Sequence, residues 1–362
     1  MADKENSTRL TRAATKRACC STPGVEQRPA KKKRVALGEL PILSNSILEV
    51  SSSNRSISKV KLRSKEGRNT DAENLGRHDS VDPQYCPIYA PDIYCYLRSM
   101  EVEEKRRPMA GYIDTIQTDV NPNMRGILVD WLVEVAEEYK LVSDTLFLTI
   151  SYIDRYLSFN SIGRQKLQLL GVSAMLIASK YEEISPPHVE DFCYITDNTY
   201  TKKQVVEMES AILKFLKFEM GNPTIKTFLS RVSHELFVYI QYPNLLLEFM
   251  GCYLAELSLL DYRCVQFLPS VVAASAVFVA RFTINQENPP WSKKLRQCTG
   301  YKLSDLKECI HLIHDLQLNR RGSNLLAIRE KYKQHRFKFV SSMVSPPVIP
   351  GLYLDDFVVH IL

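Results

Sequence analysis

The first 80 residues of this 362-residue chain contain no Phe, Tyr or Trp, although the whole chain has 14 Phe, 18 Tyr and 2 Trp. The segment is rich in Ser, Lys and Arg. It cannot bury enough apolar surface to offset the entropy that ordering would cost. The sequence therefore predicts a disordered tail over residues 1–80, ahead of a folded body.

Long hydrophobic runs are also missing. The longest strongly apolar run, Val271–Ala280, is closed by Arg281 and is far shorter than the roughly 20 residues of a membrane-spanning helix. The N-terminus is polar and charged, which is not the pattern of a secretory signal. We expect no membrane span and no membrane partner.

The nine cysteines include no CxxC pair, and their number is odd. Several lie in apolar helical runs, where a free cysteine behaves as a small hydrophobic residue. This pattern is typical of a reducing compartment and not of a disulfide-stabilised fold.

Catalytic and cofactor motifs are absent: there is no GxGxxG, Walker loop, GxSxG or HExxH. His311 and His314 share a helix face, with Cys309 nearby, but no second cluster of ligands accompanies them. No nucleophile lies in a recognisable arrangement with a base. We expect no metal and no cofactor, and a helical enzyme has no supporting site.

Positive charge is concentrated in the tail. Residues 1–80 hold 17 Lys/Arg against 9 Asp/Glu, whereas the rest of the chain holds 30 against 32, a net charge of −2. A helical transcription factor that contacts DNA with its body would need a basic body. The charge distribution therefore argues against direct nucleic-acid binding by the folded part.

The tail carries three short motifs. The basic cluster Lys31, Lys32, Lys33 and Arg34 is of the nuclear-import kind, and the alternative is a solvated charge run. Arg34 and Leu37 have the Arg-x-x-Leu spacing of a destruction box, and Lys4, Glu5 and Asn6 spell a KEN box. The tail therefore predicts a nuclear protein with a cytoplasmic pool, whose accessible segment a ubiquitin-ligase receptor can bind.

From Val81 onward the apolar spacing is helical, and nothing alternates as a strand does. Asn121, Ser143 and the Thr201–Gln204 capping box mark three helix starts. We expect an all-α fold with a short N-terminal helix and two tandem five-helix units, each with a small-residue third helix at its centre. The expected domains are 81–220 and 221–340, followed by an extended tail at 341–362. The expected helices are 92–104, 124–139, 143–158, 166–181, 189–195, 201–216, 228–237, 245–260, 269–282, 291–298 and 303–318.

The helix over Met124–Tyr139, MRGILVDWLVEVAEEY, is apolar on almost every face. A helix of this kind is usually buried among others. Its charged residues, Arg125, Asp130 and Glu134, need partners inside the fold or on another protein. Met124, Ile127, Leu128 and Trp131 share one face, which is either core or a docking surface.

Three stretches together resemble the mitotic cyclin box in order and spacing: MRGILVDWLVEV at 124–135, KLQLLGVSAMLIASKYEEISPP at 166–187 and DNTYTKKQVVEMESAILKFLKFEM at 197–220. LVEVAEEYKL and the tail sequence RVALGELP are similar to the plant A-type cyclins. The resemblance covers residues 85–340. It implies a regulatory subunit that binds and activates a cyclin-dependent Ser/Thr kinase between S phase and mitosis. It also implies removal by ubiquitin-dependent proteolysis through a ligase of the anaphase-promoting type.

The resemblance also implies roles for individual residues. Two clusters are expected, one that contacts the kinase and one that docks Arg-x-Leu motifs of substrates and inhibitors; internal ion pairing and core packing are the respective alternatives. Where the family usually has Phe, this chain has Tyr181, whose hydroxyl must reach solvent or a partner. Arg125 and Asp154 match a structural ion pair. The implied kinase-binding residues are Tyr89, Ile93, Lys180, Tyr181, Glu183, Glu209 and Phe218, and the implied docking residues are Met124, Ile127, Leu128, Trp131, Glu134, Leu167 and Gln168.

Overall fold

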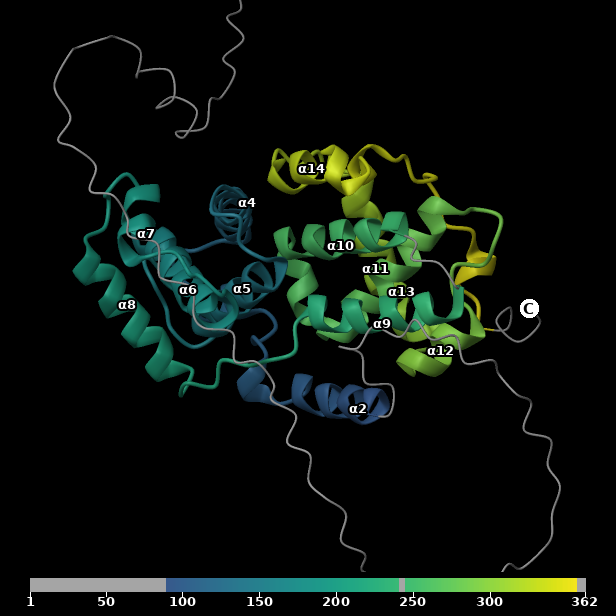
Figure 1. Ribbon diagram of the computed structural model, residues 1–362, viewed down its shortest axis with the longest axis horizontal. Helices are drawn as coiled ribbons and strands as arrows, with labels where there is room; N and C mark the ends of the chain where they lie inside the picture. The colour runs from purple at the N-terminus through teal and green to yellow at the C-terminus, as the bar shows by residue number, and fades with distance from the viewer. Residues whose placement is uncertain (1–88, 241–244, 357–362) are drawn as a thin grey trace, which may run out of the picture. The chain divides into compact units, whose positions relative to one another are not determined.

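The computed structural model describes residues 89–240 and 245–356, with the backbone alone over 233–240. Every regular element in these ranges is helical, as the sequence predicts. The tail predicted to be disordered, with its motifs at residues 4–6 and 31–37, lies outside the described residues. Figure 1 gives the helix labels used below.

The first five-helix unit is built around α6. This helix begins at Leu167, ends at Glu182 and is buried over most of its length. Gly171, Ala174 and Ala178 keep it narrow, and Gly171 lies so close to Leu128 that a Cβ there would be 2.9 Å from Leu128 Cδ1. The surrounding helices are α4 (Pro122–Glu138), α5 (Ser143–Leu157), α7 (Val189–Ile195) and α8 (Lys202–Phe215).

The second unit repeats this plan around α11 (Pro269–Ile284), another buried helix rich in Ala and Val. The prediction of two tandem five-helix units is therefore confirmed. The other helices of this unit are α9 (Ile225–Ile240), α10 (Leu245–Leu260), α12 (Lys293–Thr299) and α13 (Leu303–Gln317), and the 3-10 turn η3 covers Tyr262–Gln266.

Two of the three predicted helix caps are present. Asn121 accepts a hydrogen bond from the Met124 amide at 2.9 Å, and Thr201 and Gln204 form the expected capping box. Ser143 is not a cap: it is the first residue of α5, and its hydroxyl donates to Glu256 at 3.1 Å. The start of α5 is capped from another helix, because Glu183 at the end of α6 accepts from the Val142 amide and the Thr145 hydroxyl.

The region after α13 differs most from expectation. A short helix that the sequence did not indicate, α14 (Ala327–Tyr332), packs on α4 and α10. The stretch from residue 341, expected to be extended, includes the end of η5 (Val340–Ser342) and the 3-10 turn η6 (Gly351–Leu354), after the turn η4 (His335–Phe337). These elements are too short to show a hydrophobic period, and tertiary contacts determine them.

The N-terminal helix α2 (Ala90–Glu101) packs on the second unit (Figure 1). Tyr94 lies edge-to-face on Phe228, and the buried carboxylate of Glu101 accepts from the Ser270 amide and hydroxyl at the start of α11. The helical spacing of residues 92–104 predicts that Ile93, Tyr96, Leu97 and Met100 share one side, but Ile93 and Tyr96 are exposed. The buried face was therefore predicted only in part, because it includes the polar residue Glu101.

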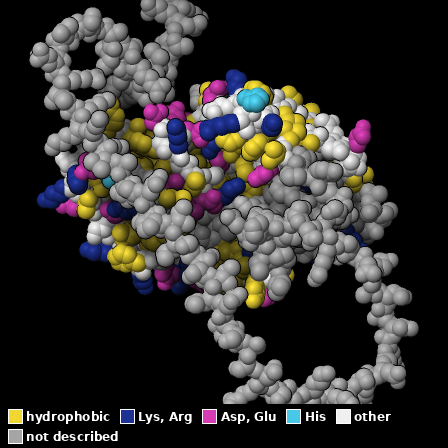
Figure 2. All heavy atoms as spheres, in the orientation of Figure 1, with side chains coloured by type: hydrophobic (Ala, Val, Ile, Leu, Met, Phe, Trp, Pro, Cys, Tyr) yellow, Lys and Arg dark blue, Asp and Glu magenta, His cyan; other side chains and the backbone are white. Residues whose placement is uncertain are grey.

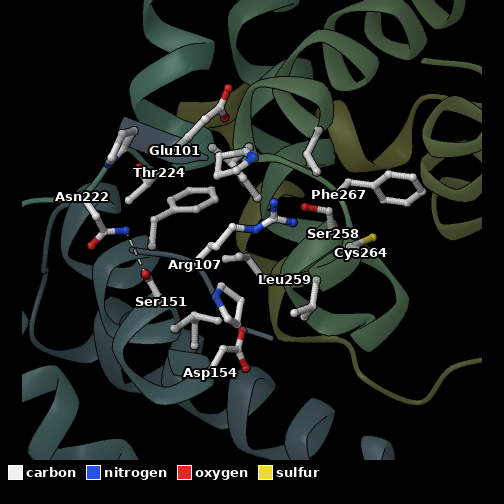
Figure 3. Close-up of a pocket in the computed structure, with 18 of the residues that line it drawn as sticks. Glu101, Arg107, Ser151, Asp154, Asn222, Thr224, Ser258, Leu259, Cys264 and Phe267 are labelled. Carbon is white, nitrogen blue, oxygen red and sulfur yellow. Dashed lines mark hydrogen bonds between the residues drawn. The ribbon is translucent and has the colours of Figure 1, made fainter. Parts of the chain in front are cut away.

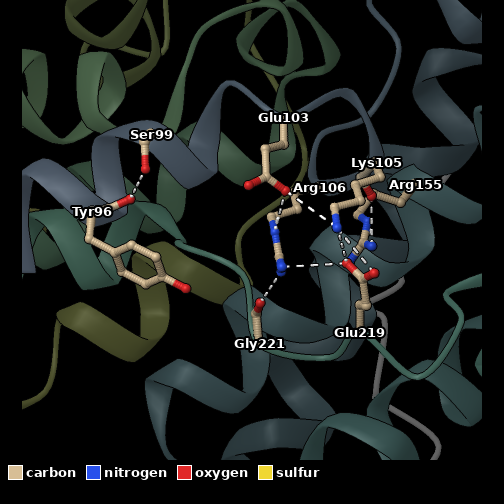
Figure 4. A network of polar contacts seen from close by, with 8 residues as sticks. All are labelled: Tyr96, Ser99, Glu103, Lys105, Arg106, Arg155, Glu219 and Gly221. Carbon is tan, nitrogen blue, oxygen red and sulfur yellow. Dashed lines mark hydrogen bonds and ion pairs between the residues drawn. The ribbon is translucent and has the colours of Figure 1, made fainter.

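The segment after α2, which contains η1 (Glu104–Arg106), ties α2 to the first unit. Lys105 and Arg106 form ion pairs with Glu219, and Arg106 also donates to the Gly221 carbonyl at 2.5 Å (Figure 4). Arg155 of α5 is buried beside them and donates to the Lys105 carbonyl, and burial lowers its pKa to about 10. The segment thus contacts both units.

A buried ion pair joins the two units at their centre. Arg125 of α4 binds Asp154 of α5 through two hydrogen bonds of 2.7 Å, and its remaining terminal nitrogen donates to the Leu259 carbonyl of α10. Tyr112 of α3 (Tyr112–Thr115) also donates to Asp154, at 2.8 Å. Burial alone would lower the pKa of Arg125, but Asp154 more than offsets this and raises it.

The contact between the units leaves two hollows. A cavity of about 100 Å³ lies above Asp154, and Figure 3 shows Arg107 extending into it toward Ser258. A groove of about 410 Å³ lies where Gly126 brings α4 against the second unit. A Cβ at Gly126 would be 3.1 Å from Leu325 and 3.3 Å from the Leu260 carbonyl. No helix in the described ranges is both long and apolar enough to cross a membrane.

Replacing Arg125 with Ala is expected to lower the free energy of unfolding by about 3–5 kcal/mol, because Asp154 would remain buried without its partner. Urea unfolding followed by circular dichroism measures this. Lys202→Ala, which removes an exposed ion pair with Glu190, is the control and should leave the free energy of unfolding nearly unchanged. An equally small effect at Arg125 would contradict its central role.

Candidate functional site

Lys180 and Glu209 form an ion pair at the surface of the first unit. Lys180 Nζ lies 2.6 Å from Glu209 Oε1, and the Lys180 side chain is 47% exposed. Lys180 comes from the last turn of α6 and Glu209 from the middle of α8. In the isolated chain Lys180 and Glu209 therefore pair with each other, which is the alternative to kinase contact given above. The Glu209 side chain is only 13% exposed, so the charge that a partner can reach most easily is the Lys180 ammonium group.

Large apolar side chains are exposed beside this pair. Ile184, in the loop after α6, is 103% exposed, Phe218 after α8 is 68% exposed, and Tyr181 is 54% exposed. A cluster of exposed apolar side chains on a folded surface marks an interaction site. We call Lys180, Tyr181, Ile184, Glu209 and Phe218 the α6–α8 surface.

The α6–α8 surface is linked to α2 through Gly221. A Cβ at Gly221 would lie 2.8 Å from the Tyr181 hydroxyl, so the extra oxygen of Tyr181 packs over this glycine. The Gly221 carbonyl in turn accepts from Arg106. On α2, Ile93 and Tyr96 are exposed, and Tyr89 at the helix start is exposed as well. The segment after α2 is held against the chain that follows Phe218 by the Arg106–Gly221 hydrogen bond and the Lys105–Glu219 ion pair (Figure 4).

Glu183 differs from the other implied kinase-binding residues. Its Oε1 atom is 2.8 Å from the Val142 amide and 2.7 Å from the Thr145 hydroxyl. Its carboxylate is therefore already engaged at the start of α5. A change at Glu183 affects the fold before it affects any contact with a partner.

The implied docking residues divide by depth. Ile127 is 52% exposed, whereas Met124 and Trp131 beside it are half-buried. Gln168 is also half-buried, whereas Leu128 and Leu167 belong to the core. We call Met124, Ile127, Trp131, Glu134 and Gln168 the α4 patch. The implied docking residues are therefore partly in the core and partly on the surface.

Glu134 supplies an unbalanced charge to the α4 patch. It is exposed and forms no hydrogen bond or ion pair among the described residues, in contrast to Arg125 and Asp130 on the same helix. Asp130 accepts from the Ala327 amide at the start of α14, at 3.0 Å. Partial burial, followed by the charge of Asp130, raises the pKa of Glu134. A cation brought by a partner would relieve this repulsion.

Sequence reasoning missed Ile184 and Tyr96. Ile184 stands between Glu183 and Ser185-Pro186-Pro187, and a large apolar residue directly before a Pro-induced break was the available signal. Tyr96 was placed with the apolar face of α2. Only the packing of Tyr94 and Glu101 shows that Tyr96 points away from the core.

No group of three His, Cys, Asp or Glu side chains in the described ranges is arranged to hold a metal ion. His314 is buried and bonded through Nε2 to the Pro346 carbonyl at 2.9 Å, so it holds the C-terminal segment. Burial lowers the pKa of His314.

Comparison with known proteins gives a consistent result. The Cyclin, N-terminal domain family matches residues 92–221, and the Cyclin, C-terminal domain family matches residues 223–346. The chain is 60% identical to Cyclin-A3-1 of Oryza sativa subsp. japonica, over 98% of this chain and 99% of that protein. It is 52% identical to the G2/mitotic-specific cyclin C13-1 of Daucus carota, over 91% and 97% of the two chains.

A solved structure shares the fold. The viral cyclin from herpesvirus saimiri aligns with a TM-score of 0.53 and 21% identity, over 62% of this chain and 96% of the viral one.

Glu183→Ala is expected to lower the free energy of unfolding by about 1 kcal/mol, because the start of α5 loses its acceptor. Urea unfolding measures the change. Glu182→Ala removes an exposed carboxylate one residue earlier and should be nearly neutral. If the two variants unfold alike, the capping role of Glu183 is wrong.

Proposed function

Because the chain belongs to the cyclin family, with plant A-type cyclins among its relatives, we propose that it binds and activates a cyclin-dependent Ser/Thr kinase in the plant cell cycle, from S phase to mitosis. Cyclins are regulatory subunits and not catalysts, so the activity belongs to the kinase. The observation that carries this proposal is the α6–α8 surface, where Ile184 and Phe218 are exposed beside a charged pair.

The proposed mechanism is selection of one kinase conformation. A kinase needs its Lys–Glu pair and its regulatory helix in place before it can transfer phosphate. A rigid surface that fits only that helix position shifts the population toward it, and differential binding to the two states supplies the energy. The packing of α6 within the first unit, and the Glu183 cap on α5, support the required rigidity.

Within the α6–α8 surface, Lys180 and Glu209 are proposed to hydrogen-bond near the kinase's regulatory helix. Tyr181, Ile184 and Phe218 supply the apolar contact, and Ile93 and Tyr96 extend it from α2. The sequence resemblance also assigned Tyr89 and Glu183 to this contact. Tyr89 is exposed and fits the role, whereas Glu183 acts here through the cap on α5.

The α4 patch is proposed to recruit substrates and inhibitors that carry Arg-x-Leu. Ile127, between Met124 and Trp131, offers apolar contact for the Leu, with Leu128 and Leu167 as the buried floor. The unpaired carboxylate of Glu134 is the complement for the Arg. Such docking raises the local concentration of chosen substrates at the kinase.

The tail motifs complete the proposal. Lys31–Arg34 would direct the protein to the nucleus, with a cytoplasmic pool remaining. Arg34-x-x-Leu37 and Lys4-Glu5-Asn6 would engage a ubiquitin ligase of the anaphase-promoting type and limit the protein's lifetime. These functions are supported by the sequence of the tail.

The competing function is DNA binding through the second unit. It requires a basic surface, whereas the chain beyond residue 80 carries a net charge of −2. Lys/Arg and Asp/Glu side chains are interspersed on the face shown in Figure 2, with apolar side chains between them. Salt-dependent DNA binding by the full chain, without effect on any kinase, would favour this function over kinase activation.

Exchanging the charges in Lys180→Glu/Glu209→Lys is expected to abolish stimulation of the kinase while preserving the helical fold, because the ion pair can still form internally. Histone phosphorylation by a mitotic-type cyclin-dependent kinase mixed with the purified chain measures this. The matched control is Lys202→Glu/Glu190→Lys, which exchanges a pair of the same 2.6 Å length on the same unit. Full stimulation by the exchanged Lys180/Glu209 variant would mean that the pair serves only the fold.

Ile127→Ala combined with Glu134→Gln is expected to slow phosphorylation of an Arg-x-Leu substrate at least about tenfold, since one apolar contact and one charge-assisted bond are lost. A short substrate without the motif should react at the unchanged rate. Leu245→Ala removes an equally exposed apolar side chain from α10 and is the control. A uniform loss on both substrates would argue against a docking role.

A further inference from the structure

The loop between α13 and α14 presents a serine with two arginines upstream, Arg320-Arg321-Gly322-Ser323. All four residues and Asn324 are exposed. Kinases that select substrates by charge use acidic groups to bind such upstream guanidinium groups. We propose that Ser323 is a phosphorylation site for an arginine-directed Ser/Thr kinase, and that the groove beside α4 holds the resulting phosphate.

Accessibility distinguishes this serine from similar sequences. The described residues contain two other Arg-x-x-Ser/Thr sequences, ending at Ser158 and Thr299. Both hydroxyls are buried and donate to carbonyls of their own helices, Asp154 and Leu295. Ser323 is the one of the three that a kinase can reach without unfolding a helix.

The loop can also adopt the extended form that a kinase cleft requires. The Gly322 amide donates to the Asn319 carbonyl and the Ser323 amide to the Asn319 side chain, both at 2.9 Å, so these two bonds stay within the loop. The Asn319 and Arg320 amides donate to the Leu316 and Asp315 carbonyls at the end of α13. Gly322 has a φ of +60°, where a side chain would be strained. Releasing these few bonds costs little compared with opening a helix.

The groove supplies the positive charge for the product. Ser323 lines it together with Arg263, Arg321 and Arg329. Its two carboxylates are already neutralised, because Asp261 pairs with Arg263 and Asp315 pairs with Arg320. Arg321 forms no ion pair or hydrogen bond among the described residues, and Arg329 donates only to the Tyr253 hydroxyl and to two carbonyls. Neither of these two arginines has a carboxylate partner. A phosphate opposite arginines gains charge-assisted hydrogen bonds and orders the loop that carries it.

The chemistry is ordinary phosphoryl transfer. The Ser323 Oγ–P bond forms as the bond from the γ-phosphorus of ATP to the ADP oxygen breaks, and a base of the modifying kinase takes the hydroxyl proton. The phosphate is placed two residues from Leu325, which contacts Gly126 in the helix turn between Met124 and Ile127. The modification therefore acts at the edge of the α4 patch.

The test uses the full chain, ATP and the catalytic domain of an arginine-directed kinase, with sites mapped by mass spectrometry. Ser323 should be phosphorylated, and Ser323→Ala should remove that site alone. Arg320→Gln/Arg321→Gln should slow modification at least about tenfold, since two charge-assisted contacts are lost. Ser161, an exposed loop serine without arginine at the two and three preceding positions, is the internal control and should stay unmodified.

Phosphorylation of a short 317–327 peptide, but not of Ser323 in the folded chain, would overturn the site. The groove is tested separately by phosphorus NMR on the signal that Ser323→Ala lacks. Arginines favour the doubly charged form of the phosphate. The second pKa of phosphorylated Ser323 should therefore lie below the usual value of about 6, and it should rise in Arg263→Gln. A pKa equal to that in the denatured chain, and unchanged in Arg263→Gln, would overturn the groove as the phosphate's holder.

Discussion

The ion pair between Arg125 and Asp154 is the interaction on which the arrangement of the two units depends. The guanidinium fork uses two nitrogens for Asp154 and the third for the Leu259 carbonyl, so one side chain satisfies both units. Tyr112 adds a fourth element through its hydrogen bond to the same carboxylate. An arginine can therefore persist in an otherwise apolar helix, and it sets the orientation from which α4 presents its patch.

A second buried charge lies at the same contact between the two units. Glu256 of α10 is fully buried and accepts from Lys331 and Tyr332 of α14 and from Ser143 of α5. With Asp130 bound to the start of α14, this short helix is fixed by polar contacts at both ends. The second unit thus packs against both α4 and α5 of the first unit.

Periodicity was sufficient to predict the eight longer helices of the two units, because each shows its buried stripe, whereas α7 and α12 have only seven residues each. The missing parts are those that other elements determine. Ser143 was wrongly predicted to be the helix cap. The cap is Glu183, forty residues later in the chain, which accepts from the Val142 amide. The buried side of α2 includes Glu101, which no hydrophobic pattern selects. The residues implied for the two surfaces come from the resemblance and stay a prediction. The exposure of Ile184, the burial of Leu128 and the unpaired carboxylate of Glu134 follow only from the structure.

The position of α2 has a consequence for the order of folding. Its bonds to Thr299 and Ser270 span 205 and 169 residues, and Arg106 reaches Gly221 across 115. Contacts of such separation pay a large loop-closure entropy and form late. Both units must therefore be assembled before α2 settles. In a partly folded chain Ile93 and Tyr96 would not be fixed in position, so the face proposed to bind the kinase is complete only after folding has finished.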